Sequence, residues 1–149
     1  MDLYCPKDRV SIGANTSLSN TVILNNTGKT PARRVTEDFY IEIVPNGSEP
    51  HFEANVRHIA MSTGVMIPNT PEEIKITRRS ANPPGDQLLT ENEKTDLAAG
   101  SSWIATHGIV WYDDIFKIRH WAKFCSWADL KPGDYSSRSC TAYNDADDK

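Results

Sequence analysis

Apolar and polar residues alternate along several short segments of this chain. The clearest alternation lies in residues 35–44, where one face carries the apolar residues Val35, Phe39, Ile41 and Ile43 and the other carries Asp38, Tyr40 and Glu42. Successive side chains of a β-strand point to opposite faces of the sheet. The pattern therefore predicts a strand with one buried and one solvent-exposed face.

Other strand-like segments follow at short intervals, separated by residues that favour turns. They are residues 9–14, 21–25, 52–59, 73–79, 104–112, 116–127 and 136–143. Only Glu91–Ala99, followed by Gly100, is composed of good helix formers. Short strands without interleaved helices predict an antiparallel sandwich or barrel. We expect an all-β, immunoglobulin-like antiparallel β-sandwich of seven to nine strands with at most one short helix, and the immunoglobulin-like assignment depends on the strand count alone.

The length of 149 residues fits one domain. We expect the β-sandwich to span residues 8–143, after a flexible N-terminal segment at residues 1–7 and before an acidic tail at residues 144–149 that frays. The chain lacks a run of about 18 apolar residues, and its first residues lack the pattern of a signal peptide. As given it is expected to be soluble, and it could be the soluble part of a longer, anchored protein.

Residues 108–125 have the pattern of a β-hairpin, because two runs rich in apolar residues flank a short polar centre. We expect Tyr112 to pair with Ile118 across the turn, and therefore Val110 to pair with His120. Both faces of this hairpin are partly apolar, which is typical of a hairpin at the centre of a sheet.

His120 and Asp114 near this turn are the candidate functional pair. One interpretation is a histidine–carboxylate pair of an enzyme, and the other is a hydrogen-bonded histidine that orders the turn. Buried polar groups normally find a partner for stability alone, which favours the second interpretation. The sequence also lacks a nucleophile motif of the G-x-S-x-G type. We therefore assign no catalytic residue.

Charge and motif spacing argue against several classes of ligand. The formal net charge is −4 and the basic residues are scattered among acidic ones, whereas a nucleic-acid-binding protein needs a concentrated positive surface. The Gly28-Lys29-Thr30 stretch lacks the first glycine and the following helix of a phosphate loop. His51, His58 and His107 have no metal-ligand spacing. We expect no nucleic-acid partner, no metal and no cofactor.

The three cysteines, Cys5, Cys125 and Cys140, do not form a disulfide framework, because their number is odd and none lies in a C-x-x-C motif. We favour a Cys125–Cys140 disulfide, because the last strand can return beside the hairpin. A bridge between Cys5 and Cys140, or three free thiols in a reducing compartment, remain as alternatives.

Two distant segments together resemble a known family. Residues 26–32 read NTGKTPA, and the later matching positions are Gly108, Val110, Tyr112, Asp114, Ile115, Phe116, His120, Phe124 and Cys125, followed by Cys140, Tyr143, Asn144, Ala146 and Asp147. In these motifs the chain resembles a widespread bacterial domain of uncharacterised function. It departs from the family pattern at three positions, where the family has isoleucine, glycine and threonine and this chain has Val110, Lys117 and Ala122. Members of that family typically carry N-terminal transmembrane helices, so the resemblance implies a membrane-associated accessory domain, and it supplies no catalytic residues.

Three functions follow from these observations as hypotheses. The first is a non-enzymatic interaction or structural module, placed by the resemblance on the periplasmic or extracytoplasmic side of a bacterial membrane, with the cytoplasmic face as the alternative. The second is a carbohydrate- or peptide-binding sandwich that uses exposed tryptophans, with Trp111 and Trp121 as the binding candidates beside Trp103 and Trp127. The third is a hydrolase or metal-dependent enzyme that uses His120 and Asp114. The protein partner and the oligomeric state stay open.

Overall fold

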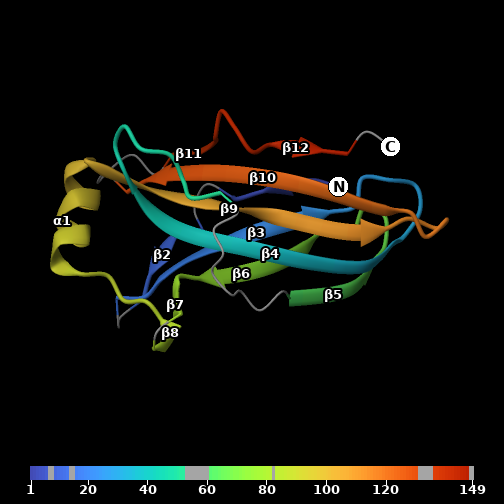
Figure 1. The fold of residues 1–149 in the computed structure, drawn as a ribbon, viewed down its shortest axis with the longest axis horizontal. Helices are drawn as coiled ribbons and strands as arrows, with labels where there is room; N and C mark the ends of the chain where they lie inside the picture. Colours follow the sequence, from blue (N-terminus) through green and yellow to red (C-terminus); the bar gives the residue numbers. More distant parts are fainter. Residues whose placement is uncertain (7–8, 14–15, 53–60, 82, 131–135, 148–149) are drawn as a thin grey trace.

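A computed structural model describes residues 1–6, 9–13, 16–52, 61–81, 83–130 and 136–147 of the chain. In these residues most of the secondary structure is β-strand, all strand pairs are antiparallel, and there is one helix. Two main sheets pack against each other in a sandwich-like arrangement (Figure 1). The predicted all-β antiparallel fold is confirmed.

The first sheet is built around one long central strand, β3, which pairs with the three other strands of the sheet. Its members are β1 (Asp2–Tyr4), β2 (Ser11–Ile12), β3 (Leu18–Asn25) and β6 (Glu72–Thr77). Seven of the eight β3 residues are buried, because β1 and β2 cover one edge of the strand and β6 covers the other.

The second sheet has the order β11–β10–β9–β4–β5, with β12 added to the outer edge of β10. Its members are β4 (Ala32–Pro45), β5 (Met61–Met66), β9 (Ser102–Asp113), β10 (Arg119–Asp129), β11 (Ser136–Ser139) and β12 (Asp145–Ala146). The hairpin of β9 and β10 is therefore central, as predicted, because β4 flanks it on one side and the C-terminal strands flank it on the other.

The helix α1 (Glu91–Ala99) forms where the sequence predicts it. Thr90 and Glu93 form a reciprocal capping box at its start, and Gly100 ends it with a left-handed φ of 72°. Arg78 donates two hydrogen bonds to the Glu93 carboxylate, at 3.0 and 2.7 Å, and so ties the helix to the end of β6. A small ribbon of β7 (Arg79–Ala81) and β8 (Pro84–Asp86) precedes the helix. Among the described residues no helix has the length and apolar character that a membrane crossing requires.

The core lies between the two sheets. Leu18, Val22 and Leu24 come from the first sheet, and Val110 and Phe124 come from the second. The rings of Phe39 and Phe124 meet edge to face at 5.5 Å, on strands that both pair with β9 at Gly108. A Cβ atom at Gly108 would lie only 2.3 Å from the Asp38 carbonyl oxygen, so only glycine fits between these strands.

The observed register of the hairpin differs from the prediction. Tyr112 pairs with His120, not with Ile118, and Val110 pairs with Ala122. The turn causes the difference, because Asp114 accepts hydrogen bonds from the backbone N–H groups of Phe116 and Ile118, so that β10 begins only at Arg119. The shift involves an even number of positions, so His120 and Val110 still lie on one face.

The structure adds short elements outside the predicted strand boundaries. The structure has twelve strands in its described residues, but only seven contain four or more residues. The N-terminal segment expected to be flexible contains β1, paired with β3, and the buried Cys5. The tail expected to fray contains β12, paired with β10. The predicted strand at residues 52–59 and the predicted start of the domain at residue 8 lie mostly or wholly outside the described residues.

Candidate functional site

All four tryptophans share the outer face of the second sheet, which points away from the core. Trp103 and Trp111 are an even number of positions apart on β9, and so are Trp121 and Trp127 on β10, so that each pair lies on one face of its strand. Trp111 and Trp121 are direct cross-strand partners. All four side chains are half-buried, so each ring has one part packed and one part open to solvent.

The outer face is hollowed into a pocket of about 500 Å³ at the end of the sheet that adjoins α1. Its aromatic walls are Trp103, Trp127 and Phe52, and its polar lining includes Asn46, Glu49 and Asp129. The two indole rings meet edge to face at 6.0 Å. The volume falls within the range of small-molecule binding sites, which typically combine aromatic walls with a few polar groups.

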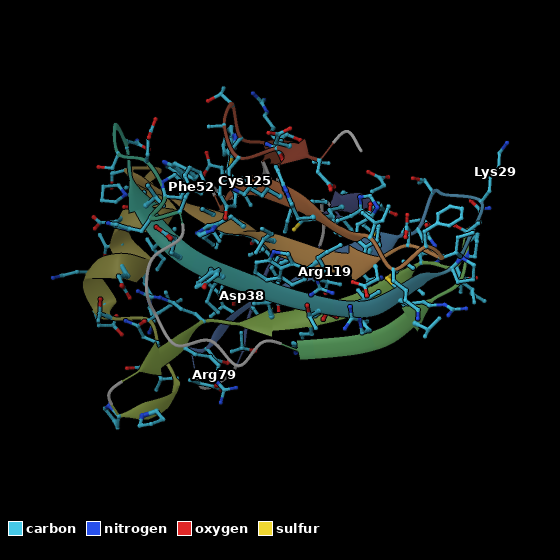
Figure 2. All side chains as sticks on the ribbon, turned by 45° about the vertical axis from the view of Figure 1, so that its right-hand side comes forward. Lys29, Asp38, Phe52, Arg79, Arg119 and Cys125 are labelled. Atoms are coloured by element: carbon cyan, nitrogen blue, oxygen red, sulfur yellow. A yellow bond between two sulfur atoms is a disulfide. The ribbon has the colours of Figure 1, made fainter. Side chains whose placement is uncertain are left out.

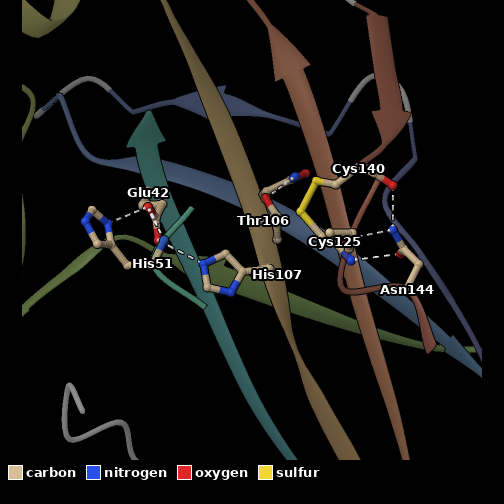
Figure 3. Close-up of a disulfide and its surroundings, with 9 residues drawn as sticks. Glu42, His51, Thr106, His107, Cys125, Cys140 and Asn144 are labelled. Carbon is tan, nitrogen blue, oxygen red and sulfur yellow. Dashed lines mark hydrogen bonds and ion pairs between the residues drawn. A yellow bond between two sulfur atoms is a disulfide. The ribbon is translucent and has the colours of Figure 1, made fainter. Parts of the chain in front are cut away.

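Specific contacts fix both sides of this pocket. On one side, the Asn46 amide donates a 2.7 Å hydrogen bond to the Gly100 carbonyl and so holds residues 46–50 to the end of α1. On the other side, a disulfide joins Cys125 to Cys140, with Cα atoms 5.3 Å apart, and the Asn144 amide bonds to both cysteine backbones (Figure 3). This is the pairing that the sequence favours, and it places Cys140 in the pocket lining.

A polar and aromatic cluster lies on the same face beside the pocket. His107 is 1% exposed, and its Nε2 lies 2.9 Å from the Glu42 carboxylate, which also contacts His51 at 3.1 Å (Figure 3). Burial acts to raise the pKa of Glu42, but hydrogen bonds from His107 and His51 outweigh it and hold the pKa below its ordinary value. Tyr40 stacks on the His107 ring and Phe52 packs against it edge to face.

Sequence reasoning treats His51 and His107 as ordinary surface or strand residues, and so misses this cluster. Glu42 and His107 are 65 positions apart and come from β4 and β9. Their proximity depends on the pairing of Tyr40 with His107. The outward position of Glu42 in the alternating segment was the one available signal. His58 lies outside the described residues.

His120 is held between two carboxylates at the other end of the hairpin. Its Nδ1 lies 2.9 Å from Asp147 and its Nε2 lies 3.4 Å from Asp114. Tyr112 stacks on the ring, and the side chain is buried, with 6% of the residue exposed. The predicted pair of His120 and Asp114 does form, but the closer partner is Asp147, which also accepts from the Trp121 backbone N–H. None of these three residues lines the pocket.

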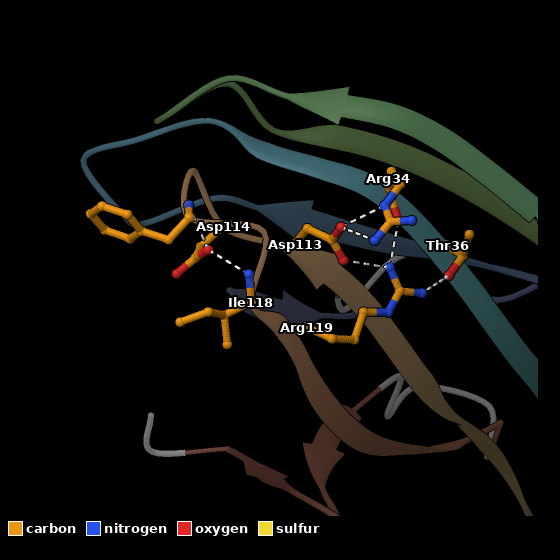
Figure 4. A network of polar contacts seen from close by, with 7 residues as sticks. Arg34, Thr36, Asp113, Asp114, Ile118 and Arg119 are labelled. Carbon is orange, nitrogen blue, oxygen red and sulfur yellow. Dashed lines mark hydrogen bonds and ion pairs between the residues drawn. The ribbon is translucent and has the colours of Figure 1, made fainter.

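A second polar network lies at this same end of the second sheet. Asp113, which is 3% exposed, binds the guanidinium groups of Arg34 and Arg119, and Arg119 also donates to the Thr36 hydroxyl (Figure 4). Burial acts to raise the pKa of Asp113, but hydrogen bonds from Arg119 and Arg34 lower it below the ordinary value. Arg34 occupies a β-bulge of β4 with a φ of 47°.

The two sequence motifs, in residues 26–32 and residues 108–125, lie close together at the hairpin end of the second sheet. Asn26 begins the first segment, and its buried side chain accepts from the Gly28 N–H and donates to the carbonyls of Thr30 and Met66. These contacts support its interpretation as an inter-strand connection. The segment then leads into β4, where Arg33 pairs with Asp113 of the second segment. The two motifs are far apart in the sequence, and the pairing of β4 with β9 is what brings them together.

Trp111 and Trp121, the sequence candidates for binding, lie at the hairpin end of the outer face and not in the pocket. The Lys123 ammonium lies 5.2 Å from the Trp121 ring and 5.0 Å from the Tyr143 ring. The pocket uses Trp103 and Trp127 instead. In the described part of the chain, no group of three or more histidine, cysteine or acidic side chains has an arrangement that could hold a metal ion.

Comparison with known proteins gives no relative from which a function could be transferred. The chain matches no protein-family model, no curated protein and no solved structure at a significant level. The resemblance to the bacterial membrane-associated domain therefore stays a prediction that depends on its quoted motifs. The function has to be inferred from the geometry of the outer face and of the two ends of the sheet.

Proposed function

We propose that this chain is a non-enzymatic β-sandwich binding module and that the pocket between Trp103 and Trp127 is its ligand site. The observation that carries the proposal is a pocket of about 500 Å³ with aromatic walls and a polar lining, on the outer face of the second sheet. Protein surfaces that combine these properties are preferred sites for small ligands. The disulfide and the Asn46 hydrogen bond hold the walls in place before a ligand arrives.

A carbohydrate is the favoured ligand class, with a short peptide as the alternative. A sugar ring has an apolar face that can pack on an indole ring, and hydroxyl groups that need hydrogen-bond partners. Trp103 and Trp127 supply half-exposed rings, and Asn46, Glu49 and Asp129 supply polar groups in the same lining. Two carboxylates in this lining disfavour an anionic ligand.

We further propose that the topology is immunoglobulin-like. The order β10–β9–β4–β5 corresponds to strands G, F, C and C′ of an immunoglobulin domain, and the order β1–β3–β6 corresponds to strands A, B and E. The helix α1 then occupies the connection from E to F. This strand order supports the assignment more strongly than the strand count of the sequence could.

An extracytoplasmic location is part of the proposal. A disulfide between Cys125 and Cys140 is stable in oxidising compartments such as the bacterial periplasm and is rare in the cytoplasm. The motif resemblance to a membrane-associated bacterial domain implies the same location. The hydrolase alternative has less support, because His120 is buried between Asp114 and Asp147 and none of the three lines the pocket.

The test is a binding titration by calorimetry with a panel of soluble oligosaccharides and short peptides. Trp103→Ala and Trp127→Ala should each weaken binding of the ligand found by about tenfold or more, because each removes an aromatic wall. The matched control is Trp111→Ala, which removes a half-buried tryptophan from the same face but outside the pocket, and it should change binding by less than about twofold. Equal losses in the three variants, or no binding to any member of the panel, would contradict the proposal.

A further inference from the structure

The hairpin end of the second sheet gathers exposed apolar side chains. Eight large apolar side chains are exposed in the described part of the chain. Five of them belong to this end, namely Val65, Ile67, Ile115, Phe116 and Ile118. Val65 lies in one row across the sheet with Arg33, Asp113 and Arg119, and the other four lie in the turns just beyond that row. Phe116 has the largest exposed fraction of the five, 76%.

Positive charges surround these apolar side chains. The exposed cations at this end are Lys29, Arg33, Arg34, Lys117 and Arg119, and Figure 2 shows Lys29 projecting from it. The two carboxylates of the same turns, Asp113 and Asp114, are already bonded to arginine and histidine partners. Asp147, which also binds His120, is a third carboxylate of the second sheet at this end. The five cations exceed these three carboxylates by two charges, in a chain whose net charge is −4. Asp2 and Glu72 approach the same end only from the first sheet.

The hairpin turn pairs most of its backbone N–H groups internally. The Asp114 carboxylate accepts from the N–H groups of Phe116 and Ile118. The N–H of Asp114 donates to the Ile118 carbonyl, and the N–H of Lys117 donates to the Asp114 carbonyl. Four of the five N–H groups of this turn are therefore paired internally. Such a turn can leave water at low cost, because unpaired backbone groups are what makes irregular chain expensive in an apolar environment.

We propose that this end docks on an anionic lipid bilayer, with the Phe116 turn entering the interfacial region. Apolar side chains gain free energy when they leave water for the boundary between headgroups and acyl chains. Lysine and arginine can keep their charged ends at the level of the headgroups while their stems pass along apolar surface. The excess of positive charge attracts negatively charged headgroups. The contact uses the hairpin end, so it leaves the tryptophan pocket near α1 open.

The test is vesicle flotation of the intact chain with phosphatidylcholine alone and with phosphatidylcholine mixed with phosphatidylglycerol. We expect about tenfold stronger binding to the anionic vesicles, and weaker binding at high salt. Phe116→Ser should weaken binding by about tenfold or more, since it removes a large apolar side chain. Lys29→Glu should weaken it at least about fivefold, since each cation near an anionic surface contributes about that factor. Both positions are exposed, and melting temperatures should confirm that the variants fold.

Two matched controls make the same chemical changes elsewhere. Leu88→Ser removes an exposed apolar side chain near α1, and Lys75→Glu reverses an exposed charge on β6; both should stay within about twofold of the original chain. Absence of vesicle binding, or equal losses in the controls, would overturn the proposal. Full binding by Phe116→Ser would reduce the contact to charge alone and would also overturn it. If the chain forms a concentration-dependent dimer that Phe116→Ser abolishes, the exposed apolar side chains at the hairpin end would instead be the contact with a second copy of this chain.

Discussion

Individual polar residues in this protein mainly join strands to one another. His120 connects the hairpin turn, through Asp114, with the C-terminal segment, through Asp147. Asp113 connects β4 with β10 through Arg34 and Arg119. His120 and the three carboxylates are buried or half-buried and have ionisable partners, which is the arrangement that compensates for the loss of water. A stabilising role alone is sufficient to account for these contacts.

The His120→Ala variant tests this role. The substitution removes the imidazole that binds the Asp147 carboxylate. We therefore expect the free energy of unfolding to fall by about 1–3 kcal/mol. A urea titration measures the change. As a control, His51→Ala removes an exposed histidine that also contacts a carboxylate, Glu42, and it should change stability by less than about 0.5 kcal/mol. Unchanged stability together with loss of a hydrolytic activity would instead favour the enzyme hypothesis.

At the scale of elements, the turn between β9 and β10 sets the register of the central hairpin. Lys117 takes a φ of 65°, a left-handed conformation that glycine adopts more easily. The Asp114 side chain compensates by accepting two backbone hydrogen bonds within the turn. The hydrogen bonds to the Asp114 side chain thus permit a lysine where the backbone alone favours glycine. The positive charge of Lys117 is then exposed beside the apolar side chains of the hairpin end.

Close approach of β4 and β9 at Gly108 yields a second prediction. Gly108→Ala should destabilise the protein by about 1–3 kcal/mol, because the added Cβ overlaps the Asp38 carbonyl oxygen and the Phe39 side chain. Chemical denaturation measures the loss. Shortening Phe39 to leucine in the same chain should not restore stability, because the overlap with the backbone at Asp38 remains. Full recovery in that double variant would show that only the side chains are in conflict.

At the scale of the whole molecule, the two ends of the second sheet have different surfaces. The α1 end carries the aromatic pocket, and the hairpin end carries exposed apolar and basic side chains. The disulfide lies on the pocket side and anchors the C-terminal segment to β10. The arrangement permits a ligand at one end and a contact surface at the other at the same time.

The thiols give a prediction for the whole chain. In the unreduced, unfolded protein, thiol titration should find one free group, Cys5, and in the folded protein that group should stay unreactive at neutral pH. Burial raises the pKa of Cys5 to about 12, so the thiolate that reacts is scarce. Reduction of the disulfide should cost about 3 kcal/mol, as expected for a closed loop of 15 residues. Three reactive thiols in the unfolded, unreduced protein would contradict the pairing.

Much of the local structure followed from local patterns. The period-two alternation of residues 35–44 marks the strand that became β4, and Glu91–Ala99 with Gly100 marks α1, because strand faces and helix caps depend on neighbours in the sequence. The termini were predicted less well. Short strands such as β1 and β12 have little pattern of their own and form because a neighbouring strand offers unpaired backbone groups.

The sequence by itself determined the class of fold, the helix, the existence of a central hairpin and the favoured cysteine pair. Tertiary structure decided the register of that hairpin, the partner of His120, the place of the Trp103–Trp127 pocket and the meeting of residues 26–32 with the hairpin turn. The physical reason is the distance along the sequence over which each kind of interaction acts. Alternation and capping act over a few residues, whereas these features depend on how strands pair across the sheets and join residues far apart in the sequence, such as Arg34 and Asp113, which are 79 positions apart.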